Sequence, residues 1–525
     1  MPVPAMRHEV RYGERIVRCF IDRPGNMDEM FRSAVQRAPD RIALVFEEQR
    51  VTYRELDARA ELVARNLVHA GFRKGDRLAL LLGNGLEFVY SILGAARAGL
   101  ISVPMNIRQK LPEVEFVLNQ CTASGIIYDA EYEANVPTAE AVGSLRHAYV
   151  VGDGRGEPFG DLFGERPAVA FPDVAEEDTY CLLYTSGTTG KPKGAMLTHV
   201  STIHTLLHYQ LGFAIAEGDI AMLAVPASHV TGLVAIILTA MRVAGCTVIQ
   251  RAFKARQFLE LASREKINFT VVVPAIYNLL LLDPDFMQFD LSNWKVAGFG
   301  GAAMPEATIE RLAAALPNLT LCNVYGSTET SSPVTMMPLG DITKAPSSVG
   351  KVLPCADIIV VDDEGREVPP GQSGELLIGG AVVVPGYWDN PAGNKAGFVM
   401  GYWVSGDIGS KDEQGYVYVF DRKKDMINRA GFKVYCIEVE STLAHIPGLV
   451  ESAVVGKPDP ILGERVHAFI YSDGSLSDEA AVKHFCAERL SDYKVPDGVT
   501  FLKEPLPRNA NGKVLKNALR ALITG

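Results

Sequence analysis

The chain has 525 residues, of which 48% are hydrophobic and 22% are charged, so it can bury large cores and is neither disordered nor a single small module. Its 62 acidic residues outnumber its 51 basic ones, and a net charge of −11 excludes a polyanion as the expected main partner, so we expect no nucleic acid binding. The eight cysteines show no CxxC pair and no metal-ligand spacing, which is typical of reduced thiols in the cytosol.

The sequence predicts no membrane span. Its first residues, MPVPAMRHEVRYGER, are polar and no apolar run follows them, so we expect no secretory signal. The apolar stretches Leu233–Gly245 and Val271–Leu282 are interrupted and shorter than the roughly 20 residues that a bilayer span needs. We therefore expect a cytoplasmic protein.

The N-terminal part alternates helices with buried strands. A T-x-x-E capping box at Thr52 begins a helix that Gly71 ends, and a strand follows over Leu78–Leu82. A second helix covers Glu87–Ala98, and Ile101–Pro104 is a short buried strand. This alternation predicts a large, doubly wound α/β body. Further buried strands are predicted over 180–184, 222–225, 247–249, 269–273, 295–299 and 320–324.

The pattern changes twice in the C-terminal part. From about Val349 short strands alternate with Gly/Pro turns, which predicts a small β-rich subdomain over 349–420. Five charges in the six residues Phe420–Asp425 mark a second boundary. Behind it the pattern is α+β, so we expect an N-terminal domain of residues 1–420 and a C-terminal cap of residues 421–525. The predicted cap helices are 437–444, 478–490 and 516–523, and its strands are 450–455, 466–471 and 499–502.

A loop rich in hydroxyls and glycines follows the predicted strand that ends at Tyr184. Its sequence, Tyr184–Gly194, is YTSGTTGKPKG. Glycines let successive backbone N–H groups face an anion and hydroxyls add donors, so the loop suits phosphate. It is not a Walker A loop, because two residues rather than four separate Gly187 from Gly190-Lys191, and Pro192 follows the lysine. The alternative interpretation is a surface loop without a ligand.

A second group of residues combines glycines with an aromatic ring and a carboxylate. Gly300 and Gly301, in AGFGGAAMPE, permit close backbone approach by a flat ligand. In the following NVYGSTE segment, Tyr325 offers an aromatic face, Thr328 a hydroxyl and Glu329 a hard oxygen ligand for Mg²⁺. Each feature alone also occurs in ordinary turns and loops.

Six motifs in order resemble those of the acyl-adenylate-forming superfamily, which contains acyl-CoA synthetases, aryl-CoA ligases, luciferases and nonribosomal adenylation domains. The similarity runs from about Met27 to Lys516. It implies an AMP-binding domain with a smaller C-terminal cap joined by a hinge, and a ligase that uses a carboxylic acid, ATP, Mg²⁺ and coenzyme A. The motifs are YTSGTTGKPKG, FGGAAMPE, NVYGSTET, GYWVSGDIG, DRKKDMINRAGFKVYCIEVE and PRNANGK.

The resemblance also implies roles for single residues. Asp407 and Arg422 would bind the ribose hydroxyls, for which a carboxylate is a natural acceptor. Thr328 would contact the α-phosphate, Glu329 would bind Mg²⁺, and Lys513 would reach the charge that develops between the substrate carboxylate and the α-phosphate. The residues implied for the phosphates are Thr185, Ser186, Gly187, Thr188, Thr189, Gly190 and Lys191, and those for adenine are Gly301, Ala302, Ala303, Asn323 and Tyr325.

The implied reaction has two halves, acyl-AMP formation and transfer of the acyl group to coenzyme A. The family rotates its cap between them about one hinge residue, here Asp421. Gly431 would line the pantetheine channel, where a side chain would block the thiol. His229 falls where relatives carry a gate between the acyl pocket and that channel, and the alternative is a satisfied buried histidine. Lys513 could likewise be a solvated lysine outside its motif.

Two further features need separate interpretation. His204 and His208 form an HxxxH pair without the glutamate of a zincin or a third ligand, so we interpret them as helix-surface or packing residues. The sequence departs from the family at Cys436, where a proline is usual, and at Ser405, where threonine is commoner. Neither the cysteine at 436 nor the serine at 405 removes a charged catalytic group.

The pocket residues favour an acid with an apolar tail. The segment around His229 lacks the aspartate that pairs with an amino-acid substrate in relatives, and Gly326 stands where acetate-specific relatives carry a tryptophan. We expect a medium- or long-chain fatty acid or an aryl acid, which the sequence does not separate. The expected lining residues are small and largely uncharged: Val230, Ala302, Ser327, Thr330 and Ser332.

Two other functions remain open at this point. An acyl-AMP ligase that loads a carrier protein would carry an insertion after the YGxTE-like motif, and Pro333–Gly374 shows no obvious extra segment. A non-catalytic nucleotide-binding homologue should have lost Glu329 or Lys513, and both are present. The sequence does not determine the oligomeric state, for which a homodimer is one candidate.

Overall fold

The computed structural model describes residues 3–185, 191–302, 304–508 and 514–524. The chain divides into two compact units, which we treat separately. The N-terminal unit comprises Met1–Ile358 and Ile378–Val404, and the C-terminal unit comprises Ile359–Leu377 and Ser405–Gly525. In the described ranges, no helix is long and apolar enough to cross a membrane.

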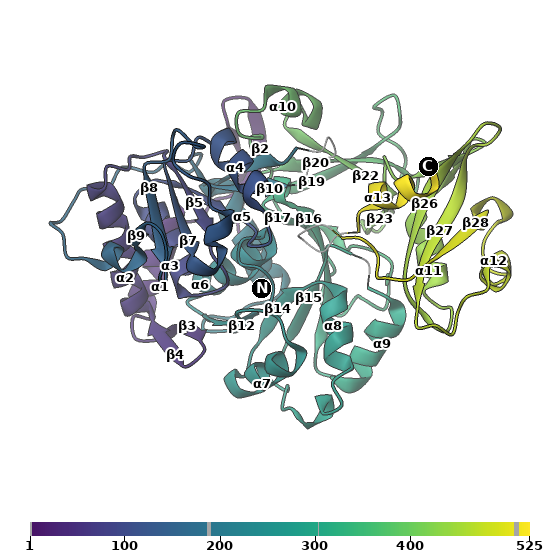
Figure 1. Cartoon of the computed structure of the whole chain (residues 1–525), viewed down its shortest axis with the longest axis horizontal. Coiled ribbons are helices and arrows are strands. Elements are labelled where there is room, and N and C mark those ends of the chain that lie inside the picture. Colours follow the sequence, from purple (N-terminus) through teal and green to yellow (C-terminus); the bar gives the residue numbers. More distant parts are fainter. Residues whose placement is uncertain (1–2, 186–190, 303, 509–513, 525) are drawn as a thin grey trace. The chain divides into compact units, whose positions relative to one another are not determined.

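Two large, mainly parallel sheets form the N-terminal unit. Within the described residues, one sheet has the strand order β11-β10-β6-β5-β7-β8-β9 and the other the order β18-β17-β16-β15-β14-β12-β13-β3-β4. Figure 1 shows α2 and α3 beside β5, β7 and β8, and α8 and α9 beside β15. The strands are β3 Ile42–Phe46, β4 Gln49–Thr52, β5 Arg77–Leu81, β6 Ile101–Pro104, β7 Gly125–Asp129, β8 His147–Val151, β9 Glu157–Pro158, β10 Thr179–Thr185, β11 Lys193–Thr198, β12 Ile220–Leu223, β13 Cys246–Ile249, β14 Phe269–Val272, β15 Val296–Phe299, β16 Thr320–Ser327, β17 Ser332–Met336 and β18 Lys351–Val352.

Two helices of this unit show what the sequence predicted and what it missed. At the start of α2, Thr52 Oγ1 accepts a hydrogen bond from Glu55 N at 3.2 Å, and the Glu55 carboxylate accepts one from Thr52 N at 2.8 Å, so the predicted capping box is confirmed. The element η3, Thr231–Leu238, is a π-helix that the sequence did not predict. The α-helices are α1 Met27–Arg37, α2 Tyr53–His69, α3 Leu86–Arg97, α4 Leu111–Gln120, α5 His199–Gly212, α6 Thr239–Arg242, α7 Ala255–Glu265, α8 Pro274–Leu281, α9 Glu306–Ala315 and α10 Pro391–Gly397, and the short 3₁₀ helices are η1 Ala130–Asn135, η2 Phe159–Phe163, η4 Phe286–Gln288 and η5 Thr328–Thr330.

The helices and strands bury apolar side chains between them. Leu81, Val103 and Ile126, from neighbouring parallel strands, pack with Val117 and Leu118 of α4 in one fully buried cluster. Burial on both faces explains why these strands read as continuous apolar runs rather than as alternating ones.

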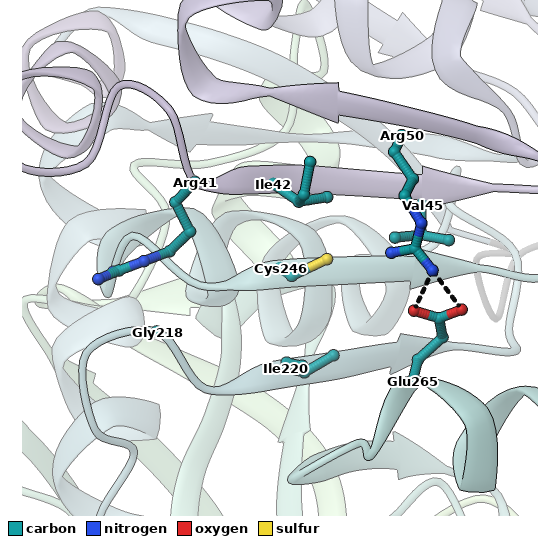
Figure 2. Close-up of a pocket in the computed structure, with 8 residues that line it drawn as sticks. All are labelled: Arg41, Ile42, Val45, Arg50, Gly218, Ile220, Cys246 and Glu265. Atoms are coloured by element: carbon teal, nitrogen blue, oxygen red, sulfur yellow. Dashed lines mark hydrogen bonds and ion pairs between the residues drawn. The ribbon is translucent and has the colours of Figure 1, made fainter.

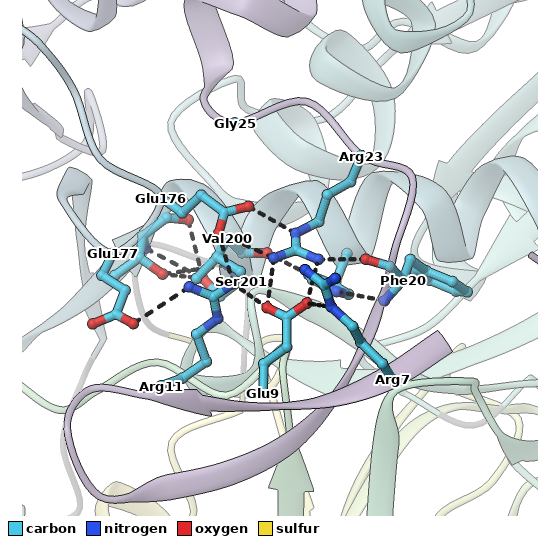
Figure 3. A network of polar contacts seen from close by, with 12 residues as sticks. Arg7, Glu9, Arg11, Phe20, Arg23, Gly25, Glu176, Glu177, Val200 and Ser201 are labelled. Atoms are coloured by element: carbon cyan, nitrogen blue, oxygen red, sulfur yellow. Dashed lines mark hydrogen bonds and ion pairs between the residues drawn. The ribbon is translucent and has the colours of Figure 1, made fainter. Parts of the chain in front are cut away.

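An N-terminal hairpin of β1 Met6–Arg11 and β2 Arg15–Phe20 precedes the two sheets. Figure 3 shows that salt bridges tie it to the segment before β10. Arg23 pairs with Glu9 at 2.8 Å and with Glu176 at 2.7 Å, and its hydrogen bond to Glu9 lowers the pKa of that carboxyl to about 2. The sequence reasoning did not predict this hairpin, because its charged residues mask the strand pattern.

The C-terminal unit is α+β. In its described part, β25-β24-β27-β26 form a sheet that β28 extends beside β27, and β22 pairs with β23 and β20. Ile427, Val439, Val454 and Ile470 belong to its fully buried core. Strand β21 Phe398–Val399 lies in the N-terminal unit, and β19 Ala356–Val361, β20 Gly374–Gly380 and β22 Tyr402–Lys411 have residues in both units. The other elements of the C-terminal unit are β23 Val417–Arg422, β24 Ile427–Arg429, β25 Phe432–Val434, β26 Leu449–Asp459, β27 Gly463–Ser472, β28 Gly498–Leu502, α11 Cys436–Leu443, α12 Glu479–Ala487, α13 Lys516–Thr524 and the 3₁₀ helix η6 Asp492–Lys494.

The predicted fold class, a large N-terminal α/β body followed by a smaller C-terminal α+β part, is confirmed. The α/β body contains two sheets rather than one, which strand periodicity alone cannot distinguish. The domain boundary at residues 420/421 and the hinge at Asp421 stay predictions.

Candidate active site

A tight turn between β16 and β17 places Glu329 beyond the carboxyl end of β16. The strand is parallel to β15 and antiparallel to β17, with a bulge at Tyr325/Gly326. Gly326 is required here, because a Cβ at this position would lie 1.8 Å from the carbonyl oxygen of Ser332. Since ligands of parallel sheets bind beyond the carboxyl ends of the strands, this edge is a candidate site.

The carboxylate of Glu329 is buried, with only 5% of the residue exposed. Tyr387 donates its hydroxyl to Oε1 at 2.9 Å, Thr185 lies 3.4 Å from the same oxygen, and the Ser327 hydroxyl bonds to Oε2. Among the described residues, no lysine or arginine forms an ion pair with this carboxylate. A buried carboxylate whose described partners are neutral hydroxyls is a hard oxygen ligand without a protein counter-charge, so the site fits the predicted Mg²⁺.

The residues predicted to contact adenine gather at the same edge. Gly300 follows β15 directly, and a Cβ there would approach the carbonyl oxygen of Val324 to 2.4 Å. Gly301 has a φ of +76° and is exposed, as is Ala302. Tyr325 is half-buried at the end of β16. Asn323 is buried and donates its side-chain amide to the carbonyl of Ser348 at 3.0 Å, so it stabilises this edge of the sheet through a backbone contact.

Part of the predicted phosphate loop can be placed. Thr185 ends β10 and pairs in register with Lys193 of β11, while Lys191 is exposed between them in the sequence. Thr328 is buried directly before Glu329. The predicted residues Ser186, Gly187, Thr188, Thr189 and Gly190, together with Ala303 and Lys513, lie outside the described residues.

In the C-terminal unit the structure brings Asp407 and Arg422 together. They face each other across β22 and β23, and Arg422 Nε lies 2.8 Å from the Asp407 carboxylate. Ser405 donates its hydroxyl to the carbonyl of Leu376 at 2.7 Å and accepts from Asp407 N at 3.0 Å. A threonine hydroxyl could make the same two hydrogen bonds, so Ser405 preserves the geometry that the usual family residue would give.

The predicted hinge residue Asp421 is tied to the start of α11. Its Oδ2 accepts a hydrogen bond from Cys436 N at 2.5 Å, and its Oδ1 accepts one from Arg422 N at 2.8 Å. Cys436 is the first residue of α11, a position that also suits proline. A proline has no N–H, so the cysteine at this position supplies a donor that the usual family residue lacks.

Gly431 lies in the turn between β24 and β25. Its φ is +90°, and no atom lies within 4 Å of the place where a Cβ would stand. Its N–H donates to Asn428 Oδ1 at 3.0 Å. The residue is therefore exposed at the tip of a left-handed turn, with open space beside it.

His229 is exposed at the start of the π-helix η3, and its Nδ1 accepts a hydrogen bond from Thr231 N at 3.3 Å. Its Nδ1 also lies 3.2 Å from Thr231 Oγ1, and the surrounding protein lowers the pKa of the imidazole, so the gate role of His229 stays a prediction. Val230 is buried at the N-cap of η3. Gly232 packs against the preceding turn, where a Cβ would meet the carbonyl oxygen of Pro226 at 2.2 Å.

The predicted acyl-pocket residues differ in what their side chains do. Thr330 is fully buried, and its hydroxyl donates to the Ser332 carbonyl at 2.7 Å and accepts from Ser327 N at 2.9 Å. The Ser332 hydroxyl bonds to Tyr209 Oη at 2.9 Å. These two hydroxyls hold the turn after β16, and a lining role for the five residues stays a prediction.

Three buried histidines on α5 were not assigned a site, and the interpretation of His204 and His208 as packing residues fits the structure. His204 accepts from Phe20 N at 3.1 Å and bonds to the Val200 carbonyl, and His208 bonds to the Pro354 carbonyl. His199 accepts from Met27 N at 3.1 Å. Burial lowers the pKa of His199 and His204 to about 4 and that of His208 to about 3.

A pocket away from Glu329 lies at the amino ends of β3, β12 and β13. The first residues of these strands, Ile42, Ile220 and Cys246, line it (Figure 2). Its volume is about 260 Å³, and Arg50 at its rim contacts both carboxylate oxygens of Glu265 through Nη2, at 2.9 and 2.8 Å. Because Glu329 follows the opposite, carboxyl end of a parallel strand, this pocket is not part of the candidate active site.

Sequence reasoning missed Tyr387, the hydroxyl donor to Glu329. It stands in the segment GYWDN after β20, 58 residues beyond its partner. No spacing pattern links the two positions, and only the pairing of distant strands brings them together.

Comparison with known proteins places this geometry in a family. The AMP-binding enzyme model matches residues 31–388, and the AMP-binding enzyme C-terminal domain model matches residues 438–513. A long-chain-fatty-acid–CoA ligase, FadD13 of Mycobacterium tuberculosis, is 34% identical over 90% of this chain and 93% of its own length. A fatty acid–[acyl-carrier-protein] ligase, ScoC of Streptomyces coeruleorubidus, is 33% identical over 93% of this chain and 95% of its own.

Solved structures give the same result. The anthranilate CoA ligase AuaEII in complex with anthranoyl-AMP has a TM-score of 0.89 and 27% identity, over 96% of this chain and 98% of its own. The o-succinylbenzoate CoA synthetase of Bacillus subtilis in complex with ATP and a magnesium ion has a TM-score of 0.84 and 27% identity, over 94% and 99%.

Proposed function

The chain belongs to the AMP-binding enzyme family and is an AMP-forming acid–CoA ligase, and we propose that it activates a medium- or long-chain fatty acid or an aryl acid at the site around Glu329. The observation that carries the proposal is the Glu329 carboxylate, buried after β16, whose side-chain partners among the described residues are hydroxyls. The enzyme uses ATP, Mg²⁺ and coenzyme A.

The first half-reaction is a phosphoryl displacement. A carboxylate oxygen of the acid bonds to the α-phosphorus of ATP, the bond to the bridging oxygen breaks, and pyrophosphate leaves, which gives acyl-AMP. Thr185, Lys191 and the hydroxyls between them hold the leaving phosphates, and Lys513 stabilises the negative charge that develops at the α-phosphate. Mg²⁺ bound at Glu329 supplies neutralisation of the phosphate charge.

The second half-reaction transfers the acyl group. The thiolate sulfur of coenzyme A bonds to the acyl carbon, and AMP leaves with the bonding electrons. We propose Gly431 for the path of the thiol, His229 for a gate between that path and the acyl pocket, and Asp421 as the residue about which the cap turns between the two steps. Asp407 and Arg422 bind the ribose hydroxyls.

The substrate class follows from the pocket candidates and from what the relatives act on. FadD13 is named for long-chain fatty acids and AuaEII for anthranilate, an aryl acid. Val230, Ala302 and Ser327, which we propose as lining residues, have small side chains that suit either tail. We further propose a cytosolic enzyme, in keeping with eight buried free cysteines, and a homodimer as the oligomeric state to be tested.

The experiment is pyrophosphate release with ATP and Mg²⁺ over a panel of acids from acetate to long-chain and aryl acids, each with and without coenzyme A. We expect turnover with one class of acid that depends on coenzyme A. Release that ignores coenzyme A but requires a carrier protein would favour the second candidate, which the similarity to ScoC supports. No release with any acid would contradict both.

A further inference from the structure

Tyr387 belongs to a short segment that lies along the edge strand β11. Tyr387 pairs with Ala195 as an antiparallel bridge, Met196 N donates to the Gly386 carbonyl at 3.0 Å, and Trp388 N donates to the Gly194 carbonyl at 2.8 Å. Strand β11 begins at Lys193, two residues after Lys191, the last residue predicted to bind the phosphates. The segment therefore borders the site without being part of any predicted motif.

The side chain of Tyr387 is held from several sides. The residue is 6% exposed, its ring packs edge-on against Phe398 with centroids 5.5 Å apart, and Lys193 Nζ lies 5.1 Å from the ring centroid. Asn394 of α10 accepts a hydrogen bond from Tyr387 N at 2.6 Å and donates one to its carbonyl at 3.0 Å. A ring fixed this way presents its hydroxyl in one direction.

A second connection fixes the residues just before it. The Val384 N–H donates to the backbone carbonyl of Glu329 at 3.0 Å. Buried Arg15, from the N-terminal hairpin, donates to the carbonyls of Val384 and Pro385 at 2.9 and 2.8 Å. Backbone and side chain of Glu329 are thus both bound by this one segment.

We propose that Tyr387 is a positioning residue for Glu329: its hydroxyl orients the buried carboxylate so that it can bind the divalent cation that accompanies ATP. The inference rests on the proposed function. Each carboxylate oxygen has two lone pairs. Tyr387 makes the shorter of the two hydroxyl contacts to Oε1, at 2.9 Å against 3.4 Å for Thr185, so it sets the rotation of the group, and Oε2, which bonds to Ser327, keeps a lone pair for a metal. A neutral donor does this without the charge neutralisation that a lysine or arginine would cause. Partners of this kind orient metal ligands and tune their affinity.

The test is the Mg²⁺ dependence of ATP binding, measured by calorimetry at fixed ATP, for the full-length protein and for Tyr387→Phe. Phenylalanine keeps the ring and its packing but removes the hydroxyl. We expect the apparent Mg²⁺ dissociation constant to rise about 10- to 100-fold, as for other residues that hold metal ligands. Tyr402→Phe, which removes a tyrosine bond to Asp357 instead, is the matched control and should leave the constant unchanged.

Two further variants separate positioning from a general structural effect. Tyr387→Phe added to Glu329→Gln should shift the Mg²⁺ constant no further than Glu329→Gln alone, because the hydroxyl acts through that carboxylate. Asn394→Ala removes the hydrogen bonds to the backbone of Tyr387 and should shift the Mg²⁺ constant in the same direction as Tyr387→Phe. If Tyr387→Phe does not fold, Asn394→Ala is measured in its place.

The outcomes distinguish this inference from the proposed function. An unchanged Mg²⁺ constant in Tyr387→Phe, or full additivity with Glu329→Gln, overturns the positioning role even if the enzyme forms acyl-CoA. A wild-type protein that binds ATP with Mg²⁺ but releases no pyrophosphate with any acid refutes the proposed function, and the Tyr387 comparison is still decided by binding.

Discussion

Glu329, Thr330 and Ser332 lie within four residues of one another, yet their side chains have different environments. The hydroxyls of Thr330 and Ser332 bond to the backbone and to Tyr209, so they hold the turn. Glu329 receives hydroxyl donors but no counter-charge among the described residues. At the residue scale, what separates a supporting side chain from a reactive one is therefore an unneutralised charge.

Lys513→Ala tests the first half-reaction. The lysine would supply the positive charge at the α-phosphate, so its loss should lower acid-dependent pyrophosphate release on the order of 10²–10³-fold. Thioester formation from supplied acyl-AMP should remain largely intact. Both rates are measured separately, because an overall rate does not tell which step lost its stabilisation. Equal loss in both steps would contradict the assignment.

Gly431→Leu tests the second half-reaction. The φ of +90° and the open space beside this glycine mean that leucine would both strain the turn and project into that space. We expect slow transfer from acyl-AMP to coenzyme A and near-normal pyrophosphate release. Gly415→Leu, at another turn with a φ of +83° and no atom within 4 Å of the place of a Cβ, is the control for strain alone. Normal coenzyme A turnover in Gly431→Leu would refute the channel role.

At the scale of elements, α5 combines a structural role with a pH dependence. Its buried imidazoles must stay neutral, since His199 and His204 accept backbone N–H groups of the N-terminal segment through an unprotonated nitrogen. Their folded-state pKa values of about 4 lie below the ordinary value of 6.5 because burial disfavours the charged form. The unfolded chain therefore binds protons that the folded one does not, and the stabilising contribution present above pH 6.5 is lost as the pH falls towards 4.

His204→Gln should reduce this acid sensitivity. Glutamine can still hydrogen-bond but does not titrate, so the loss of unfolding free energy between pH 7 and pH 4.5 should be about 2–3 kcal/mol smaller than in the wild type. The measurement is the urea midpoint at both pH values. His484→Gln, an exposed histidine on α12, serves as the control. An identical pH dependence in His204→Gln and the wild type would show that His204 does not carry the effect.

At the scale of the whole molecule, the chain forms two compact units, and the residues of the proposed reaction are shared between them. Glu329 and Thr185 belong to the N-terminal unit, whereas Asp407, Arg422 and Gly431 belong to the C-terminal one. The proposed mechanism includes a rotation of the cap between the two steps, and Asp421 is the proposed hinge.

Asp421→Pro tests the pivot. Proline fixes φ near −65°, so it should prevent a rotation about this residue and slow one half-reaction much more than the other. Asp421→Ala removes the same carboxylate, and with it the bond from Cys436 N, but leaves φ free. We expect both half-reactions to stay within about tenfold of the wild type in the alanine variant. Similar rates in the two variants would place the pivot elsewhere.

The sequence by itself determined the family, the order of its motifs and the residue types at the site. Phosphate, adenine and metal recognition depend on local features, such as glycines that allow close approach and a carboxylate after a strand, and these are visible in Tyr184–Gly194 and Asn323–Glu329. Short-range signals such as the capping box at Thr52 were confirmed for the same reason, since both partners lie within one helical turn.

Only the tertiary structure decided which distant residues meet. Tyr387 reaches Glu329, Arg15 reaches Val384, and the imidazoles of α5 reach the N-terminal segment through pairings that leave no periodic mark in the sequence. The tertiary structure also decided that the α/β body has two sheets and that Thr231–Leu238 is a π-helix. The physical reason is that hydrophobic periodicity reports whether a residue is buried, whereas its partners depend on how the elements pack.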